Sequence, residues 1–210
     1  MIGIKYYYQI KRSGTQSFKL MEQQIFQFGE EIEGIMIEII ELDKETYLNK
    51  EFTLYYQTKG YYDIESTEKG FDVTYKIFKE AKEMSFSDVF FGEWLESPKA
   101  YGAFENGELL GYVEGTLEKW NNRYRISNIC VFNSSKRHKG IGTLLMDSIL
   151  SEAMKSGARM VVLETQTCNE NAISFYRKNG FEIIGFDLFA YSNTDKERNE
   201  IRIEMGKILD

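Results

Sequence analysis

The chain has 210 residues, of which 42% are hydrophobic and 15% aromatic, enough to bury a core as one domain with an added N-terminal segment. Its 33 acidic side chains outnumber 26 basic ones. The net charge of -7 argues against general nucleic-acid binding, which needs a basic face, and suits a small cationic partner instead. Apolar runs end well before the roughly 18 residues that span a membrane, so we expect no membrane partner.

The cysteine and histidine content limits the redox and metal chemistry. Cys130 and Cys168 are too few for a disulfide framework, and no stretch has the pattern of a secretory signal. We therefore expect a cytoplasmic protein. His138 is the single histidine, so the sequence offers no His/Cys zinc site and we expect no bound metal.

The N-terminal third is the hardest part to interpret. Residues 1–34 mix aromatic, glycine and polar residues without a sustained period, and we treat them as an extension of a domain that covers residues 35–210. The stretch Gly34–Leu42 predicts a strand. Asp43 is placed to cap a short helix that ends near Leu48.

The next segment is rich in tyrosine and glycine. Residues 51–70 show no clear period, and we expect irregular structure there. From Asp72 to Met84, apolar residues recur at helical spacing and predict a helix. The residues that form this apolar stripe are Val73, Ile77, Phe78 and Ala81.

Turn residues make the following elements clearer. Asn106-Gly107 favours a two-residue hairpin turn, so strands are expected at Tyr101–Glu105 and Leu109–Leu117, with a third at Tyr124–Phe132. This is an antiparallel meander. Beyond residue 142 the sequence predicts a helix, a strand at Met160–Thr165, a helix at Asn171–Lys178, and strands near Phe181–Ala190 and Glu200–Ile208.

The stretch KRHKGIGTLL, residues 136–145, joins positive charge to two glycines at the start of a helix. The first N–H groups of a helix have no internal partners, and the helix dipole makes that end positive. Glycines let a phosphate approach the backbone closely. The loop is therefore either an anion site or a solvated helix start. It lacks the third glycine of a dinucleotide fingerprint and the lysine of a Walker loop.

Two motifs together resemble the GNAT superfamily of N-acetyltransferases. Arg137, Gly140 and Gly142 form R-x-x-G-x-G, and Asn169–Phe181 is similar to the signature N-x-x-A-x-x-x-Y-x-x-x-G-F. The resemblance covers roughly residues 100–190 and implies an α+β fold: a mixed, mostly antiparallel sheet with splayed central parallel strands flanked by helices. Within the superfamily, the segments that resemble streptothricin acetyltransferases are Trp120-Asn121, Arg123-Tyr124 and Leu163–Gln166.

The resemblance implies acetyl-CoA (coenzyme A) as cofactor, bound between the two splayed strands. The strand backbone would hold the pantetheine arm, and the glycine loop the pyrophosphate. The cofactor-binding residues implied are Ile129, Cys130, Val131, Arg137, His138, Lys139, Gly140, Ile141, Gly142, Thr143, Asn169, Ala172 and Tyr176. Asn169 can instead, or in addition, be a helix N-cap.

The implied chemistry is direct attack of an amine on the thioester in a ternary complex. An amine with a pKa near 10.4 arrives protonated, so a carboxylate is a candidate base, either Glu164 or Glu114. Both are equally explained as exposed strand residues. Tyr176 resembles the family tyrosine that protonates the departing thiolate, and its alternative role is core packing. Asp187 is a further candidate, for orienting a cationic substrate.

The acceptor is expected to be a small cationic amine, with a streptothricin-type antibiotic as the first choice and antibiotic resistance as the role. A GNAT enzyme for protein lysines, N-termini or polyamines, or a non-catalytic acyl-CoA-binding regulator, would keep both motifs. The aromatic region that includes Phe90, Phe91 and Trp94 either belongs to the core or lines the acceptor pocket with Glu93 and Glu96. A homodimer is possible through the C-terminal hairpin, as the family suggests.

Overall fold

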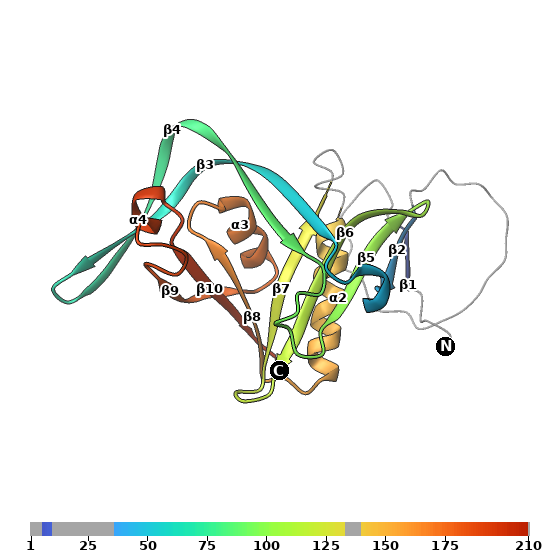
Figure 1. Cartoon of the computed structure of the whole chain (residues 1–210). Coiled ribbons are helices and arrows are strands. Elements are labelled where there is room, and N and C mark those ends of the chain that lie inside the picture. The colour runs from blue at the N-terminus through green and yellow to red at the C-terminus, as the bar shows by residue number, and fades with distance from the viewer. Residues whose placement is uncertain (1–5, 10–35, 133–139, 210) are drawn as a thin grey trace.

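The fold is built on an eight-stranded sheet, seen in a computed structural model that describes residues 6–9, 36–132 and 140–209 (Figure 1). The strand order is β1-β2-β5-β6-β7-β8-β10-β9. These strands are β1 (Tyr6–Gln9), β2 (Met36–Glu41), β5 (Lys99–Glu105), β6 (Glu108–Glu118), β7 (Arg123–Val131), β8 (Met160–Gln166), β9 (Glu182–Asp187) and β10 (Arg202–Ile208). Neighbours pair antiparallel except β7 and β8, which are parallel. The predicted mixed sheet is confirmed.

The turn chemistry and the helix pattern explain most of these elements. Asn106 and Gly107 adopt φ values of 52° and 82°, the left-handed pair that a tight β5–β6 hairpin needs. Helix α2 (Ile141–Lys155) buries one face against the sheet, as the periodicity predicts. That face consists of Ile141, Leu145, Met146, Ile149, Leu150 and Ala153.

The shorter helices lie at the ends of strands. Helix α1 (Lys44–Tyr47) is capped by Asp43, whose carboxylate accepts from the Thr46 N–H at 2.9 Å, as predicted. Helix α3 (Glu170–Lys178) follows β8 and packs its Ile173 and Tyr176 into the core, and α4 (Asp195–Arg198) precedes β10. None of the helices in the described ranges is long and apolar enough to cross a membrane.

The expectations for residues 51–70 and 72–84 are wrong. These segments form one long hairpin of β3 (Glu51–Thr67) and β4 (Gly70–Val89), paired from end to end. Most of the stripe that predicted a helix is exposed, so no core stabilises a helix there. Valine, threonine, tyrosine and phenylalanine are frequent in both strands, and such residues favour strands when a partner strand is in reach.

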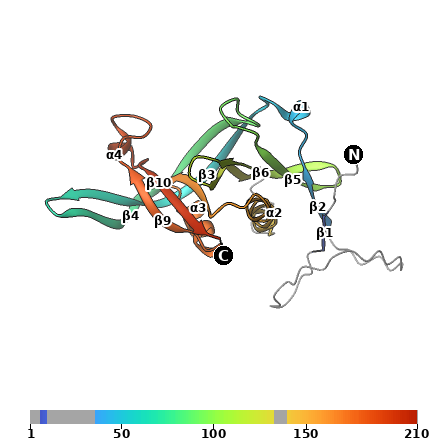
Figure 2. The ribbon, with the colours of Figure 1, turned by 90° about the horizontal axis from the view of Figure 1, so that it is seen from below.

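The base of the hairpin packs on the sheet face opposite α2 (Figure 2). Phe52 makes edge-on contacts with Phe90, Tyr112 and Phe132, at centroid distances of 5.4, 5.3 and 5.9 Å. Near the tip, Phe71 meets Phe186 of β9 at 4.9 Å. Phe90 and Phe91 belong to the core, whereas Trp94 is 68% exposed, so the aromatic region predicted as core or pocket does not behave as one unit.

The sheet opens into a fork between β7 and β8. The parallel pairing of β7 with β8 ends at Ile126 and Leu163, beyond which the strands diverge (Figure 1). At the same point β7 carries one extra residue, because Glu114 pairs with Asn128 and Gly115 pairs with Ile126. This β-bulge at Ser127 reverses the alternation of side chains along the rest of β7.

Candidate active site

The N-terminus of α2 is the place at which the sequence predicts an anion site. Gly140 is its N-cap with φ 81°, and no side chain of the described residues caps the helix. The first helical bond runs from the Leu144 N–H to the Gly140 carbonyl at 3.1 Å, so the preceding N–H groups lack an intrahelical acceptor. A Cβ at Gly140 would meet nothing within 4 Å, whereas one at Gly142 would lie 3.3 Å from the Phe175 ring.

The predicted loop is described from Gly140 onward. Arg137, His138 and Lys139 lie outside the described residues. Ile141 is buried and Thr143 is exposed, so of these two only Thr143 presents its side chain to a ligand at the helix start.

The β7 side of the fork carries the predicted backbone segment. Because of the bulge, Ile129 and Val131 pack against the main core while Cys130 joins the cluster around Tyr112 on the opposite face. Residues 127–131 lie beyond the last residue pair of β7 with β8, so this part of the β7 edge faces the fork.

Helix α3 forms the other side of the fork. Asn169 is its N-cap and accepts from the Ala172 N–H at 3.3 Å, so the capping role is present. Tyr176 is 8% exposed and contacts Phe175 and Phe181 at centroid distances of 5.7 and 6.2 Å. Burial raises the pKa of the Tyr176 hydroxyl, which therefore stays protonated and can act only as a proton donor.

Glu114 is fully buried on the face opposite α2. Its Oε2 accepts from the Phe91 N–H at 2.8 Å, and its Oε1 accepts from Ser127 Oγ at 3.4 Å. Burial raises the pKa of Glu114 to about 7, the charge of Asp88 adds to this, and the bonds from Phe91 and Ser127 oppose it. Phe91 has φ 53°, a strained conformation for a bulky residue, at the point where its N–H meets this carboxylate.

The structure places a second carboxylate, that of Asp88, near Glu114, and the sequence does not predict it as a site residue. Asp88, at the end of β4, accepts from Asn128 Nδ2 at 3.0 Å. Asn128 is 7% exposed and directly follows the bulge. Asp88 and Asn128 are forty residues apart in the sequence. The sequence also predicts a helix over residues 72–84 of β4, so no local pattern indicates that these two side chains meet. The nearby Tyr112 hydroxyl is buried and makes no hydrogen bond within the described part of the chain.

Glu164 lies in a different environment, at the first position after the fork opens. It lines a cavity of about 280 Å³ with Arg125, Arg202 and Glu204. Glu204 forms an ion pair with Arg125 at 3.1 Å. Among the described residues, the Glu164 carboxylate has longer contacts, at 3.6 Å to Arg202 and 3.5 Å to the Tyr191 hydroxyl. Its carboxylate is therefore the most available negative charge in this cavity.

The structure thus gives different surroundings to the two carboxylates considered as bases. Glu114 is buried beside the bulge of β7, and Glu164 is partly exposed on β8. Asp187 contacts Arg202 at 3.4 Å and so extends the charged network of the cavity. The described residues contain no group of three or more His, Cys, Asp or Glu side chains that could hold a metal ion.

The family model and two relatives that match this chain are acetyltransferases. The model of the acetyltransferase (GNAT) family matches residues 59–181. A streptothricin acetyltransferase of Escherichia coli is 30% identical over 139 residues, 66% of this chain and 77% of the relative. A second streptothricin acetyltransferase, from Streptomyces lavendulae, is 32% identical over 122 residues, 58% of this chain and 64% of the relative.

Solved structures show the same fold. Nourseothricin acetyltransferase superposes with a TM-score of 0.67 at 22% identity, covering 83% of this chain and 99% of that chain. A Bacillus anthracis protein solved in complex with acetyl coenzyme A superposes with a TM-score of 0.63 at 22% identity, covering 83% and 98%. Both likenesses confirm the fold that the two motifs predicted.

Proposed function

The chain belongs to the acetyltransferase (GNAT) family, and we propose that it moves an acetyl group from acetyl-CoA to a primary amine of a small cationic acceptor, with a streptothricin-type antibiotic as the acceptor. The observation that carries the proposal is the fork between β7 and β8, together with the N-terminus of α2, which has no side-chain cap among the described residues. The acidic net charge of the chain supports a cationic acceptor.

The residues present fit acetyl-CoA. The β7 segment Ile129, Cys130 and Val131 lies beyond the last residue pair with β8 and suits an amide-containing arm, and the first N–H groups of α2, which have no intrahelical acceptor, suit a diphosphate. Further contacts would come from Gly142, Thr143, Asn169, Ala172 and Tyr176, and from Arg137, His138 and Lys139. When bound, the cofactor supplies the acetyl group as an activated thioester.

Glu114 is the proposed general base. A raised pKa of about 7 suits a group that must accept a proton near neutral pH. Because Glu114 has no solvent contact, we propose that the half-buried Ser127 hydroxyl passes the proton from the amine to Oε1. Glu164 would bind the acceptor ammonium group, and Tyr176 would hold a proton for the departing thiolate. Holding both reactants in the fork lowers the entropic cost of the attack.

The test is thiol release from acetyl-CoA with a panel of amines: streptothricin, aminoglycosides, polyamines, lysine peptides and a control without acceptor. We expect streptothricin to give the highest kcat/KM. Faster turnover of a peptide or a polyamine would replace the acceptor and keep the reaction. Binding of acetyl-CoA without turnover of any amine would contradict the enzymatic proposal and favour a regulator.

A further inference from the structure

The β3–β4 hairpin contacts both sides of the fork. On the β7 side, Asp88 accepts from Asn128. On the β8 side, the Tyr56 hydroxyl donates to Gln166 Oε1 at 3.2 Å and the Tyr62 N–H donates to the Thr167 carbonyl at 3.1 Å. The hairpin therefore crosses the end of the sheet at which β7 and β8 diverge (Figure 1).

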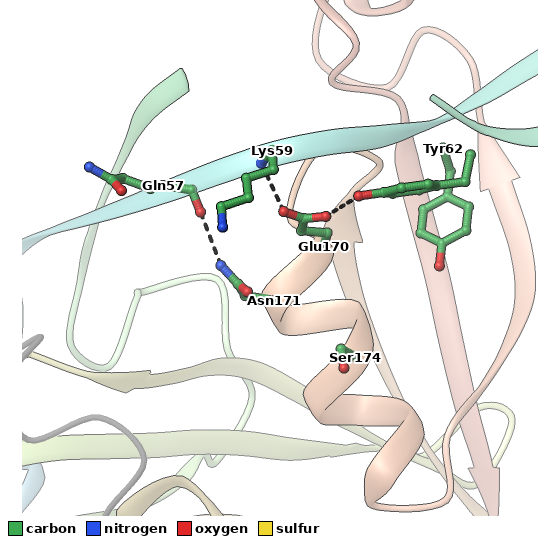
Figure 3. Close-up of a pocket in the computed structure, with 7 residues that line it drawn as sticks. Gln57, Lys59, Tyr62, Glu170, Asn171 and Ser174 are labelled. Carbon is green, nitrogen blue, oxygen red and sulfur yellow. Dashed lines mark hydrogen bonds between the residues drawn. The ribbon is translucent and has the colours of Figure 1, made fainter. Parts of the chain in front are cut away.

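Helix α3 holds the middle of the hairpin through polar contacts (Figure 3). Glu170 accepts from the Lys59 N–H at 2.8 Å and from the Tyr75 hydroxyl. Asn171 Nδ2 donates to the Gln57 carbonyl at 3.0 Å. The pairing of β3 with β4 shifts register between Thr58 and Gly60, so Lys59 has no partner residue on β4. Its N–H donates to Glu170 instead.

Most of these contacts are hydrogen bonds around a gap, and Arg177 of α3 adds one by donating to the Tyr62 hydroxyl at 3.1 Å. A cavity of about 590 Å³ separates the hairpin from α3, and polar or tyrosine side chains line it. By contrast, α3 itself is fixed by Ile173 and Tyr176 in the core. Loss of these contacts should therefore loosen the middle of the hairpin, whose base and tip keep their own ring contacts, and leave the helix in place.

We propose that Glu170, Tyr75 and Asn171 are positioning residues: they hold the hairpin across the fork and so form the wall against which the acceptor binds. This inference rests on the proposed function. The hairpin does not hold the cofactor, because the residues proposed to bind acetyl-CoA belong to β7, α2 and α3 and to the loop before α2. Loosening the hairpin should weaken acceptor binding and spare acetyl-CoA binding.

The test is the double variant Tyr75→Phe/Asn171→Ala, which removes two hydrogen bonds and keeps Glu170 and its helix. The matched control is Tyr61→Phe/Asn193→Ala. Tyr61 stacks on Phe78, a contact that phenylalanine preserves, and Asn193 is exposed. We expect the acceptor KM of the test variant to rise about tenfold, because two of the hydrogen bonds that hold the hairpin are lost.

The KM for acetyl-CoA should stay equal to that of the control, and the thermal midpoint should fall by no more than a few degrees, as two lost hydrogen bonds imply. An unchanged acceptor KM would overturn the proposal. Equal increases in both KM values would mean that the contacts are only structural, and would overturn it as well.

Hydrogen exchange provides a readout that does not need turnover. We expect faster amide exchange in residues 52–62 of the test variant than in the control, with equal affinity for acetyl-CoA by calorimetry. If the wild-type protein acetylates no amine, the proposed function fails while the exchange still reports on the hairpin. Unchanged exchange would show that the three residues do not hold it.

Discussion

Glu114 is the residue whose environment has the clearest functional consequence. Its carboxylate is buried beside the bulge of β7, with one oxygen on the Phe91 N–H and the other near Ser127. Burial favours the neutral form and raises the pKa to about 7, whereas the residue in an unfolded chain titrates near 4.5. The side chain therefore changes charge in the pH range in which an amine acetyltransferase has to remove a proton.

Activity should follow this titration. We expect kcat/KM to rise with pH through an apparent pKa near 7, because the base must be ionised to accept a proton. Glu114→Gln should lower kcat/KM by about 100-fold or more and remove that limb of the profile. Ser127→Ala should lower the rate and keep the limb. A profile of Glu114→Gln that still rises through pH 7 would assign the base to another residue.

The free energy of unfolding should fall with rising pH, in contrast to kcat/KM, which should rise. Between pH 4.5 and 7 the folded state binds more protons at Glu114 than the unfolded state does, so stability falls as pH rises through this window and then levels off. Glutamine does not titrate. The difference in thermal midpoint, Glu114→Gln minus wild type, should therefore increase from pH 5 to pH 8. A difference that is independent of pH would contradict the raised pKa.

At the scale of elements, the start of α2 has the geometry that the proposed diphosphate site requires. Its N-cap is a glycine in the left-handed conformation, no acidic residue occupies its first turn, and Thr143 is exposed there. A negative side chain in this turn would interact favourably with the helix dipole. The same charge would repel a bound diphosphate.

Thr143→Glu separates these two effects. We expect the helix to gain about 0.3–1 kcal/mol, seen as an equal or higher thermal midpoint. Acetyl-CoA affinity, measured by calorimetry, should fall about tenfold or more because two like charges approach closely. Thr143→Gln, which has a similar size and no charge, should bind acetyl-CoA more tightly than Thr143→Glu. Equal affinities in the two variants would place the diphosphate elsewhere.

At the scale of the whole molecule, charge sets the approach of the acceptor. The chain carries a net charge of -7, and within the cavity beside the fork Glu164 is only loosely paired. Long-range attraction of a cation depends on the Debye length, which falls from about 30 Å at 0.01 M salt to about 8 Å at 0.15 M.

Salt should therefore weaken acceptor binding. We expect the acceptor KM to rise several-fold between these two salt concentrations while kcat changes little, because the chemistry occurs at short range. Glu164→Gln should reduce the salt dependence, since it removes one of the attracting charges. A KM that does not respond to salt would argue against a cationic acceptor.

Local patterns account for the elements that the sequence predicted well. The Asn106-Gly107 turn, the amphipathic face of α2 and the Asp43 cap are each encoded within a few neighbouring residues. The apolar spacing at Val73 and Ile77 was misleading, because a strand with a long partner can carry the same residues on an exposed face.

The sequence alone therefore determined the fold class and the family, and it predicted an anion site at the start of α2, since these depend on short motifs and local periodicity. The tertiary structure decided what surrounds them. It buried Glu114, placed Asp88 beside Asn128 and laid the hairpin across the fork. Those contacts join residues far apart in the chain, and side-chain burial, which sets a pKa, exists only after distant strands have packed together.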